Sequence, residues 1–502
     1  MKKYILAFDI GTTSTRTLLF DKSLQIIARE QEEIISSYPE ESWVEQSPDD
    51  LFNITLKLAQ KLLKKNYIKP IQIAAIGVTN QRETTILWDK NTGKPVYNAV
   101  VWQDKRTSKL CQKLKDEGYA RIIHKKTGLH IDPYFSATKV KWILDNMPGL
   151  REEAEKGNIL FGTVDTWFLW KLTKGKYHCT DVSNASRTML FNISKMCWDD
   201  YLLKLFNVPK HILPEVTASS GKIALSDAAF FDGTSIPICG IAGDQQAALF
   251  GQHCFEKGMI KNTYGTGCFI LMNCGKKPVF SKNGLITTVA WKIKNDIFYA
   301  IEGSVFYAGA VIKWLRDELG LIKSVAETES MATEQEEQTD LFFVPCFTGL
   351  GAPYWNMDAR GIITGLFAGT RKEHIVKAAL DSLAYQSKDV IKAMQMDLRY
   401  KIKQLNVDGG ASVNNYLMQF QSDILNAEVI RPSTTESTAL GAAMLAGLGI
   451  GFWHEDDFKR KREVEWIFKP QMNEYKRKTL YEKWQLAVYK ANMKRKGIKT
   501  KF

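Results

Sequence analysis

The chain has 502 residues, enough for about two to four domains or two large lobes. Apolar residues make up 45% and charged residues 25%, which excludes a mostly disordered, collagen-like or repeat-coil protein. Lysine plus arginine (68) exceed aspartate plus glutamate (55). The net charge of +13 leaves nucleic acid, an anionic membrane surface and a small anionic ligand such as a nucleotide open as partners.

The basic residues are densest between Lys490 and Phe502, where we expect a solvated, frayed end and no nucleic-acid groove. The eight cysteines form no Cys-x-x-Cys pair and no zinc-site spacing, so we expect reduced thiols and a cytoplasmic location. The N-terminal apolar run ends at Asp9, too early for a signal peptide. The uncharged stretch 437–453 falls just short of a membrane span, and we interpret it as a buried helix.

The first thirty residues predict three antiparallel strands. Apolar runs at 4–8, 17–20 and 24–28 are separated by turns, the first of them at Gly11–Ser14. Ser47-Pro48-Asp49-Asp50 then predicts a helix that starts with a capping box and carries proline in its first turn. The apolar run 73–78 predicts a further strand.

The second half opens in the same way as the first. The strand predicted at 259–262 leads into Gly265-Thr266-Gly267 and a further apolar run, as Gly11-Thr12 does near the N-terminus. We interpret this as a weak internal duplication, with chance as the alternative, and expect two lobes covering 1–252 and 253–502. Later, Thr370–Glu373 predicts a second capping box. Mixed strands and helices in two halves predict α/β lobes.

The familiar nucleotide-binding motifs are absent. There is no P-loop, and no Gly-x-Gly-x-x-Gly follows a strand and opens a helix. The first candidate is instead the turn 9–14, where backbone N–H groups, three hydroxyls and the nearby Arg16 suit phosphate oxygens. Asp9, at the strand end, could hold Mg²⁺ through water. An ordinary polar hairpin is the alternative for this segment.

Two more glycine turns follow apolar strands. They are Gly265-Thr266-Gly267 and Asp408-Gly409-Gly410, the second followed by Asn414. Three such turns spread over both halves suggest a nucleotide held between lobes, and three unrelated turns are the alternative.

Two polar positions are candidates for the chemistry. Asp244 follows a strand and precedes a helix-forming run, so it is either a helix N-cap or a general base, or both. Arg82 and Glu83 follow the strand 73–78 and form either a structural salt bridge or a donor–acceptor fork for an uncharged polyol. Trp102 and Tyr134 lie downstream, as core residues or as ligand walls.

These segments together resemble the FGGY family of carbohydrate kinases, in the actin-like ATPase superfamily. The resemblance spans about 4–453 and includes both family signatures, Tyr134–Asn146 and Gly361–Asp381. Thr79–Thr85 and Asn262–Gly267 are similar to the branch of the family that phosphorylates glycerol. The resemblance implies two actin-like (ribonuclease H-like) lobes with the nucleotide and substrate between them. It also implies transfer of the γ-phosphoryl group of ATP to glycerol, giving sn-glycerol 3-phosphate and ADP.

The resemblance also implies roles for individual residues. Asp244 would be the catalytic base, and Asp9 would lie near the Mg²⁺. The implied glycerol-binding residues are Arg82, Glu83, Trp102, Tyr134, Asp244, Gln245 and Phe269. The implied ATP- or ADP-binding residues are Thr12, Thr13, Ser14, Arg16, Thr266, Gly309, Gly410 and Asn414, with Lys313 standing where relatives often carry glutamine.

Some features depart from the family pattern. The loop 228–233 carries no histidine and no glycine-rich basic run, which puts in doubt the phosphorylation and sugar-bisphosphate controls of some relatives. We expect no nucleic-acid partner, no membrane span, and a homodimer or homotetramer. Three alternatives stay open: a kinase for a ketopentose or another polyol, a non-catalytic actin-like ATPase, and a nucleic-acid binder.

Overall fold

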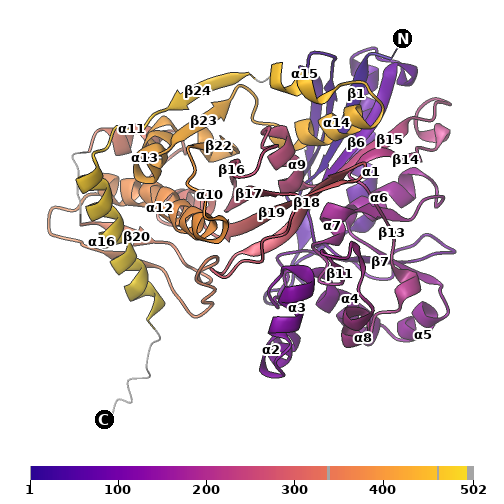
Figure 1. The fold of residues 1–502 in the computed structure, drawn as a ribbon, viewed down its shortest axis with the longest axis horizontal. Helices are drawn as coiled ribbons and strands as arrows, with labels where there is room; N and C mark the ends of the chain where they lie inside the picture. The colour runs from indigo at the N-terminus through magenta and orange to yellow at the C-terminus, as the bar shows by residue number, and fades with distance from the viewer. Residues whose placement is uncertain (1, 336–339, 461–462, 494–502) are drawn as a thin grey trace.

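The computed structural model describes residues 2–335, 340–460 and 463–493. Its centre is a mixed sheet of thirteen strands in the order β24-β23-β22-β16-β17-β19-β18-β14-β15-β6-β1-β2-β3. Figure 1 shows most of the first half of the chain (indigo to magenta) on one side of the molecule and most of the second half (orange to yellow) on the other, apart from helices of the second half that lie beside the N-terminal strands. The α/β class expected from the sequence is confirmed.

The N-terminal strands form the expected antiparallel meander. β1 (Tyr4–Ile10) pairs with β2 (Ser14–Phe20), which pairs with β3 (Ile26–Glu33). On its other side β1 runs parallel to β6 (Ile73–Asn80), and β6 runs parallel to β15 (Pro237–Gly243). The carboxyl ends of three parallel strands therefore meet at one edge, which gathers the residues that follow them.

The second half repeats this topology. β16 (Ile260–Tyr264) pairs antiparallel with β17 (Cys268–Gly275), which pairs antiparallel with β19 (Asp296–Val305). β22 (Gln404–Asp408) and β23 (Glu428–Pro432) extend it in parallel. The strand–turn–strand opening predicted for each half is thus confirmed. The division at residue 252 stays a prediction; α9 (Asp244–Gly251) ends beside it.

A helix from the second half by sequence packs on the strands of the first. α14 (Ser437–Gly449) contacts α9, β6 and β15, and Figure 1 shows it over the N-terminal strands. Gly77 and Gly240 allow this approach, because a Cβ at either position would meet the backbone of α14. The expected buried helix is confirmed. Elsewhere the two halves of the sheet join through β18 (Ile286–Ile293) and β14 (Ser220–Leu225), which are paired in parallel at a single pair of residues.

Gly441 of α14 is the tightest point of this packing. A Cβ there would meet the carbonyl of Ala247 in α9, which is backbone and cannot rotate away. We expect Gly441→Ala to lower the free energy of unfolding by about 3 kcal/mol, at the upper end of overpacking costs. Urea unfolding followed by tryptophan fluorescence measures this. Thr438→Ala, at a half-buried position of the same helix, is the control; an equal loss in both variants would contradict the packing argument.

One predicted helix start is right and the other is displaced. The side chain of Ser47 accepts a hydrogen bond from Asp50 N–H and begins α1 (Pro48–Lys65), as expected. The helix predicted from Thr370 begins instead at Lys372, with Arg371 as the N-cap. Thr370 Oγ1 accepts from the N–H of Phe367, so it closes the preceding turn and is not free to cap the helix.

The remaining elements surround the sheet. β24 (Val464–Phe468) is the edge strand of the central sheet beside β23, and the short strands outside that sheet are β4 (Ser36–Ser37), β5 (Glu45–Gln46), β7 (Ile86–Asp89), β8 (Ala99–Val100), β9 (Ile159–Gly162), β10 (Cys179–Asp181), β11 (Phe191–Asn192), β12 (Cys197–Trp198), β13 (Glu215–Thr217), β20 (Phe342–Val344) and β21 (Ile362–Thr364). The helices are α2 (Ser108–Asp116), α3 (Ala120–Thr127), α4 (Ser136–Asn146), α5 (Leu150–Glu155), α6 (Val164–Leu172), α7 (Val182–Ala185), α8 (Asp200–Phe206), α10 (Gly309–Asp317), α11 (Glu327–Thr333), α12 (Lys372–Leu398), α13 (Asn415–Leu425), α15 (Glu455–Arg460) and α16 (Glu474–Asn492).

All eight cysteines are free thiols, and only Cys197 is exposed. Within the described ranges, every helix is too short or too polar to cross a membrane. Most of the basic C-terminal stretch, from residue 494 on, lies outside the described residues.

Candidate active site

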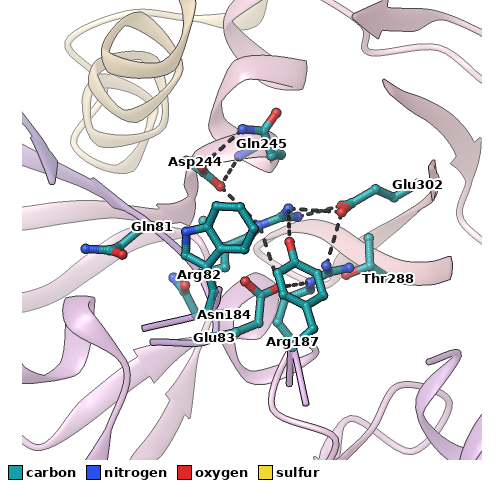
Figure 2. A network of polar contacts seen from close by, with 12 residues as sticks. Gln81, Arg82, Glu83, Asn184, Arg187, Asp244, Gln245, Thr288 and Glu302 are labelled. Atoms are coloured by element: carbon teal, nitrogen blue, oxygen red, sulfur yellow. Dashed lines mark hydrogen bonds and ion pairs between the residues drawn. The ribbon is translucent and has the colours of Figure 1, made fainter. Parts of the chain in front are cut away.

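Arg82 and Asp244 meet where two parallel strands end. Arg82 follows β6 and Asp244 follows β15, and these strands are hydrogen-bonded neighbours. Arg82 Nε lies 3.1 Å from Asp244 Oδ1. Figure 2 shows Arg82 between Asp244 and a second carboxylate, Glu302. Asp244 is the first residue of α9 and Gly243 is its N-cap, so the N-cap interpretation of Asp244 is wrong by one residue.

Four buried charged residues form a network under this contact. Arg82 Nη2 lies 3.0 Å from Glu302 Oε1, and Arg187 Nη2 lies 3.1 Å from the same oxygen. Arg187 Nε also pairs with Glu83. Glu302 is on β19, in the second half of the chain, so this network joins the two halves (Figure 2).

The network changes the interpretation of Arg82 and Glu83. The two adjacent side chains are 3.9 Å apart, but each has a closer partner, Glu302 for Arg82 and Arg187 for Glu83. Two cations and two anions are therefore buried together, so each buried charge has a partner of opposite sign. Burial opposes ionisation of Glu302, yet the charges of Arg187 and Arg82 lower its pKa to about 2.

Three aromatic side chains lie next to the charged network. The ring of Trp102 is 5.5 Å from that of Tyr134 and 6.1 Å from that of Phe269, both edge-on. Tyr134 Oη accepts a hydrogen bond of 3.4 Å from Arg82. All three are half-buried, so their surfaces are partly open. Phe269 is the second residue of β17, and Trp102 thus contacts the second half of the chain.

Gln245 and Lys261 complete the surroundings of Asp244. Gln245 donates to both carboxylate oxygens, at 2.7 Å from its backbone N–H and 3.1 Å from its side-chain amide. Its side-chain oxygen accepts from Lys261 on β16. Burial lowers the pKa of Lys261 to about 8, although the carboxylates of Asp408 and Asp244 oppose this shift. The carboxylate of Asp244 is therefore held on one side and open on the other, with 29% of its side chain exposed.

The first glycine–threonine turn lies beside this group. Thr12 Oγ1 accepts a 2.8 Å hydrogen bond from the indole of Trp102. The turn is closed by Gly11 N–H to Ser14 C=O, and Thr13 is exposed. Arg16 pairs at 2.9 Å with Glu436, which precedes α14, so this predicted phosphate ligand contacts a residue of the opposite half.

Asp9 is the next-to-last residue of β1, just before that turn. Burial raises its pKa to about 7, although the nearby Arg16 guanidinium opposes the shift. Among the described residues no three His, Cys, Asp or Glu side chains form a group that could hold a metal alone. A single carboxylate fits Mg²⁺, which is commonly bound by one or two carboxylates together with water and substrate phosphates.

The predicted nucleotide residues of the second half come together in part. Gly309, the first residue of α10, donates its N–H to the carbonyl of Gly265 at 3.0 Å, which places it against the turn containing Thr266. Gly409 packs on Tyr264 at the base of the same turn, and the space above Gly410 is open.

Two other predicted nucleotide residues are placed differently. Lys313 is exposed on α10. The side chain of Asn414 already caps α13 and donates to Thr328, so it is the least available of the predicted nucleotide residues for contact with a ligand.

Comparison with known proteins then decides the family. The description "FGGY family of carbohydrate kinases, N-terminal domain" matches residues 4–251, and the corresponding C-terminal domain matches residues 260–450. The chain belongs to the FGGY family of carbohydrate kinases. The family expected from the sequence is therefore confirmed.

Similar FGGY proteins cover nearly the whole chain. Glycerol kinase 2 of Thermotoga maritima is 54% identical over 487 residues, which is 97% of this chain and 98% of that protein. Glycerol kinase of Alkaliphilus oremlandii is 54% identical over 492 residues, 98% of each. The crystal structure of Plasmodium falciparum glycerol kinase with ADP has a TM-score of 0.92 at 36% identity and covers 98% of both chains. The two-lobed actin-like fold expected from the sequence is confirmed.

Sequence reasoning missed four charged residues of this FGGY site: Arg187, Glu302, Lys139 and Lys261. Glu302 lies within a mostly apolar strand, which predicts core, and Lys261 is the second residue of the short strand Ile-Lys-Asn-Thr-Tyr, which carries no site pattern. Lys139 lies inside the first family signature, which was noted as a whole without a role for the lysine. A single charge inside a mostly apolar strand is a local signal for Glu302 alone among these four residues.

Proposed function

We propose that this chain is a glycerol kinase, which transfers the γ-phosphoryl group of ATP to glycerol to give sn-glycerol 3-phosphate and ADP. The observation that carries the proposal is the contact of Arg82 with Asp244 and Tyr134 at the meeting of the two halves. Identity of 54% to glycerol kinases over nearly the full length supports the choice of substrate.

Glycerol offers three hydroxyls, and the site offers matching partners. Arg82 donates, Glu83 accepts and the Tyr134 hydroxyl does either, so a small polyol can be held by all three. The rings of Trp102 and Phe269 cover its carbon backbone and limit its size. Recognition by paired donors and acceptors rejects molecules that leave one of them unsatisfied.

In this proposal Asp244 acts as the general base. Its carboxylate takes the proton of the attacking hydroxyl while Gln245 and Arg82 hold its orientation. Phosphoryl transfer depends on alignment and charge neutralisation more than on covalent chemistry. Closure of the two halves around the reactants excludes water, which would otherwise compete as a nucleophile.

ATP binds between the glycine turns of the two halves in this proposal. Thr12, Thr13, Ser14 and Arg16 hold phosphate oxygens from the first half. The residues proposed from the second half are Thr266, Gly309, Gly410, Asn414 and Lys313. We also propose a cytoplasmic location, supported by eight free thiols, and a homodimer or homotetramer stays a prediction.

Asp9 would hold Mg²⁺, which neutralises phosphate charge when bound. We expect Asp9→Asn to raise several-fold the Mg²⁺ concentration needed for half-maximal activity, because the only proposed protein carboxylate of the site is lost. Initial rates over a Mg²⁺ titration at saturating glycerol measure this. Asp21→Asn, at the other end of the β1–β2 hairpin, is the control. An unchanged Mg²⁺ dependence in Asp9→Asn would remove Asp9 from the metal site.

Coupled ADP release with and without glycerol tests the function. The proposal requires strong stimulation by glycerol and weak stimulation by a pentulose. Preference for the pentulose would overturn the interpretation of Arg82 and Glu83 as glycerol ligands. ADP release that does not depend on any polyol would instead favour a non-catalytic actin-like ATPase.

A further inference from the structure

Glu83 is held in an unusual backbone conformation. Its φ is +62°, in the left-handed region that non-glycine residues seldom adopt. The residue is buried, with 1% exposure, and its carboxylate pairs with Arg187. A strained buried residue persists only where its surroundings over-determine it, and such residues cluster at functional sites.

Three donors converge on the carbonyl oxygen of Glu83. They are Thr85 Oγ1 at 3.1 Å, Ser136 Oγ at 3.0 Å and Lys139 Nζ at 3.2 Å. Ser136 begins α4 and Lys139 lies one turn further along it, so the start of this helix faces the peptide group that follows Glu83. These bonds fix the orientation that the positive φ requires.

Lys139 also makes a second contact. Its ammonium donates to the carbonyl of Tyr134 at 2.8 Å, so one cation joins the backbones of Glu83 and Tyr134. The lysine is 0% exposed, and burial lowers its pKa to about 8. A buried cation is costly, and an apolar side chain would fill the space at lower cost. Its hydrogen bonds therefore account for its presence better than packing does.

We propose that Lys139, the first of the two lysines in the first family signature, is a positioning residue that fixes Glu83 and Tyr134 at a set separation for the polyol. The inference rests on the proposed function, which places both residues on glycerol. Lys139 acts through their backbones and does not itself touch the substrate. Ser136 supports only the Glu83 side of the arrangement.

Kinetics of Lys139→Met test the proposal against a matched variant. We expect KM for glycerol to rise roughly tenfold or more, with KM for ATP changed by less than about twofold, because only the polyol ligands are displaced. Lys141→Met, on the same helix with a partly exposed side chain paired to Asp145, should leave both constants unchanged. Equal rises in both KM values, or the same effect from Lys141→Met, would overturn the proposal.

Two further variants remain informative if Lys139→Met folds poorly. Ser136→Ala removes one donor from the Glu83 carbonyl and should raise KM for glycerol by a smaller factor in the same direction. In a Glu83→Gln background, Lys139→Met should raise KM for glycerol by less than it does in the wild type, because residues that act through one another are non-additive. Fully additive effects indicate a merely structural lysine and overturn the proposal.

Hydrogen exchange separates this inference from the proposed function. Amides of residues 80–85 should exchange faster in Lys139→Met than in the wild type or Lys141→Met, with or without a working substrate. Unchanged exchange in that segment would overturn the positioning role even if glycerol is the substrate. If the wild type shows no glycerol-dependent ADP release, the proposed function fails while faster exchange still supports Lys139 as the residue that fixes the loop.

Discussion

Asp244→Asn is expected to lower kcat with glycerol by about 10³-fold, within the range that a positioned general base contributes. The amide keeps the shape of the side chain and can still accept from Arg82, but it cannot take the proton of the attacking hydroxyl. KM for ATP should stay close to that of the wild type, because the nucleotide loops are untouched. Steady-state ADP release over separate glycerol and ATP titrations measures these constants.

Asp200→Asn provides the matched control for this change. Asp200 is also the first residue of a helix, α8, and its side chain is exposed and paired with Lys210. Loss of a carboxylate at such a position lowers the free energy of unfolding by at most about 1 kcal/mol through the helix dipole. The protein therefore stays folded, and kcat should not change. Near wild-type turnover in Asp244→Asn would show that another group is the base.

The strands that build the site follow from local patterns. The N-terminal meander and the helix start at Ser47 can be predicted because apolar runs, turn residues and helix caps are each recognised within a few consecutive residues. The second hairpin, whose turn contains Gly265-Thr266, is visible for the same reason. Its resemblance to the first predicted a duplicated topology that the strand pairing confirms.

Long-range packing could not be predicted in this way. The approach of α14 to the first-half strands depends on small residues at Gly77 and Gly240, far away along the chain. Nothing in the local pattern of either segment indicates its partner. The start of α12 was misplaced because Thr370 was equally suited to a turn and to a cap, and the turn formed.

The candidate site was predicted where it lies at strand ends and missed where it lies inside elements. Arg82, Glu83 and Asp244 stand out because polar residues follow buried strands. Glu302 could not be assigned, because its partner Arg82 is 220 positions away and a lone charge in an apolar strand has no local meaning. Arg82 and Glu83 do approach each other, at 3.9 Å, but the sequence did not indicate the closer partners of both residues, and their role as a polyol-binding fork stays a prediction.

Glu302→Gln should produce the largest loss of stability among these variants. Glu302 is 0% exposed and pairs with both Arg82 and Arg187, so the change leaves two buried guanidinium groups facing Glu83 and the half-exposed Asp244. Removing one partner of a buried ion pair typically costs about 3–5 kcal/mol of the free energy of unfolding, because an uncompensated charge remains. Urea unfolding at neutral pH measures this cost.

Asp296→Asn gives the comparison with a solvent-exposed pair. Asp296 pairs with Lys276, and 58% of its side chain and 59% of that of the lysine are exposed, so its loss should lower the free energy of unfolding by less than about 1 kcal/mol. A similar cost for both variants would mean that the buried network adds no more than a surface pair. Glycerol KM should rise in Glu302→Gln alone, because Arg82 is then free to move.

The pH dependence of stability gives an independent test of the charge on Glu302. Its pKa is lowered from 4.5 to about 2 by Arg187 and Arg82, against the effect of burial. A carboxylate with a lowered pKa contributes stability that is fully present above its unfolded-state pKa and is lost as pH falls towards the folded-state value. The stability difference between wild type and Glu302→Gln should therefore be constant from neutral pH to about pH 5 and shrink between about pH 4.5 and 2. A difference that does not change over that acid range would mean that Glu302 stabilises the fold through its shape and not through its charge.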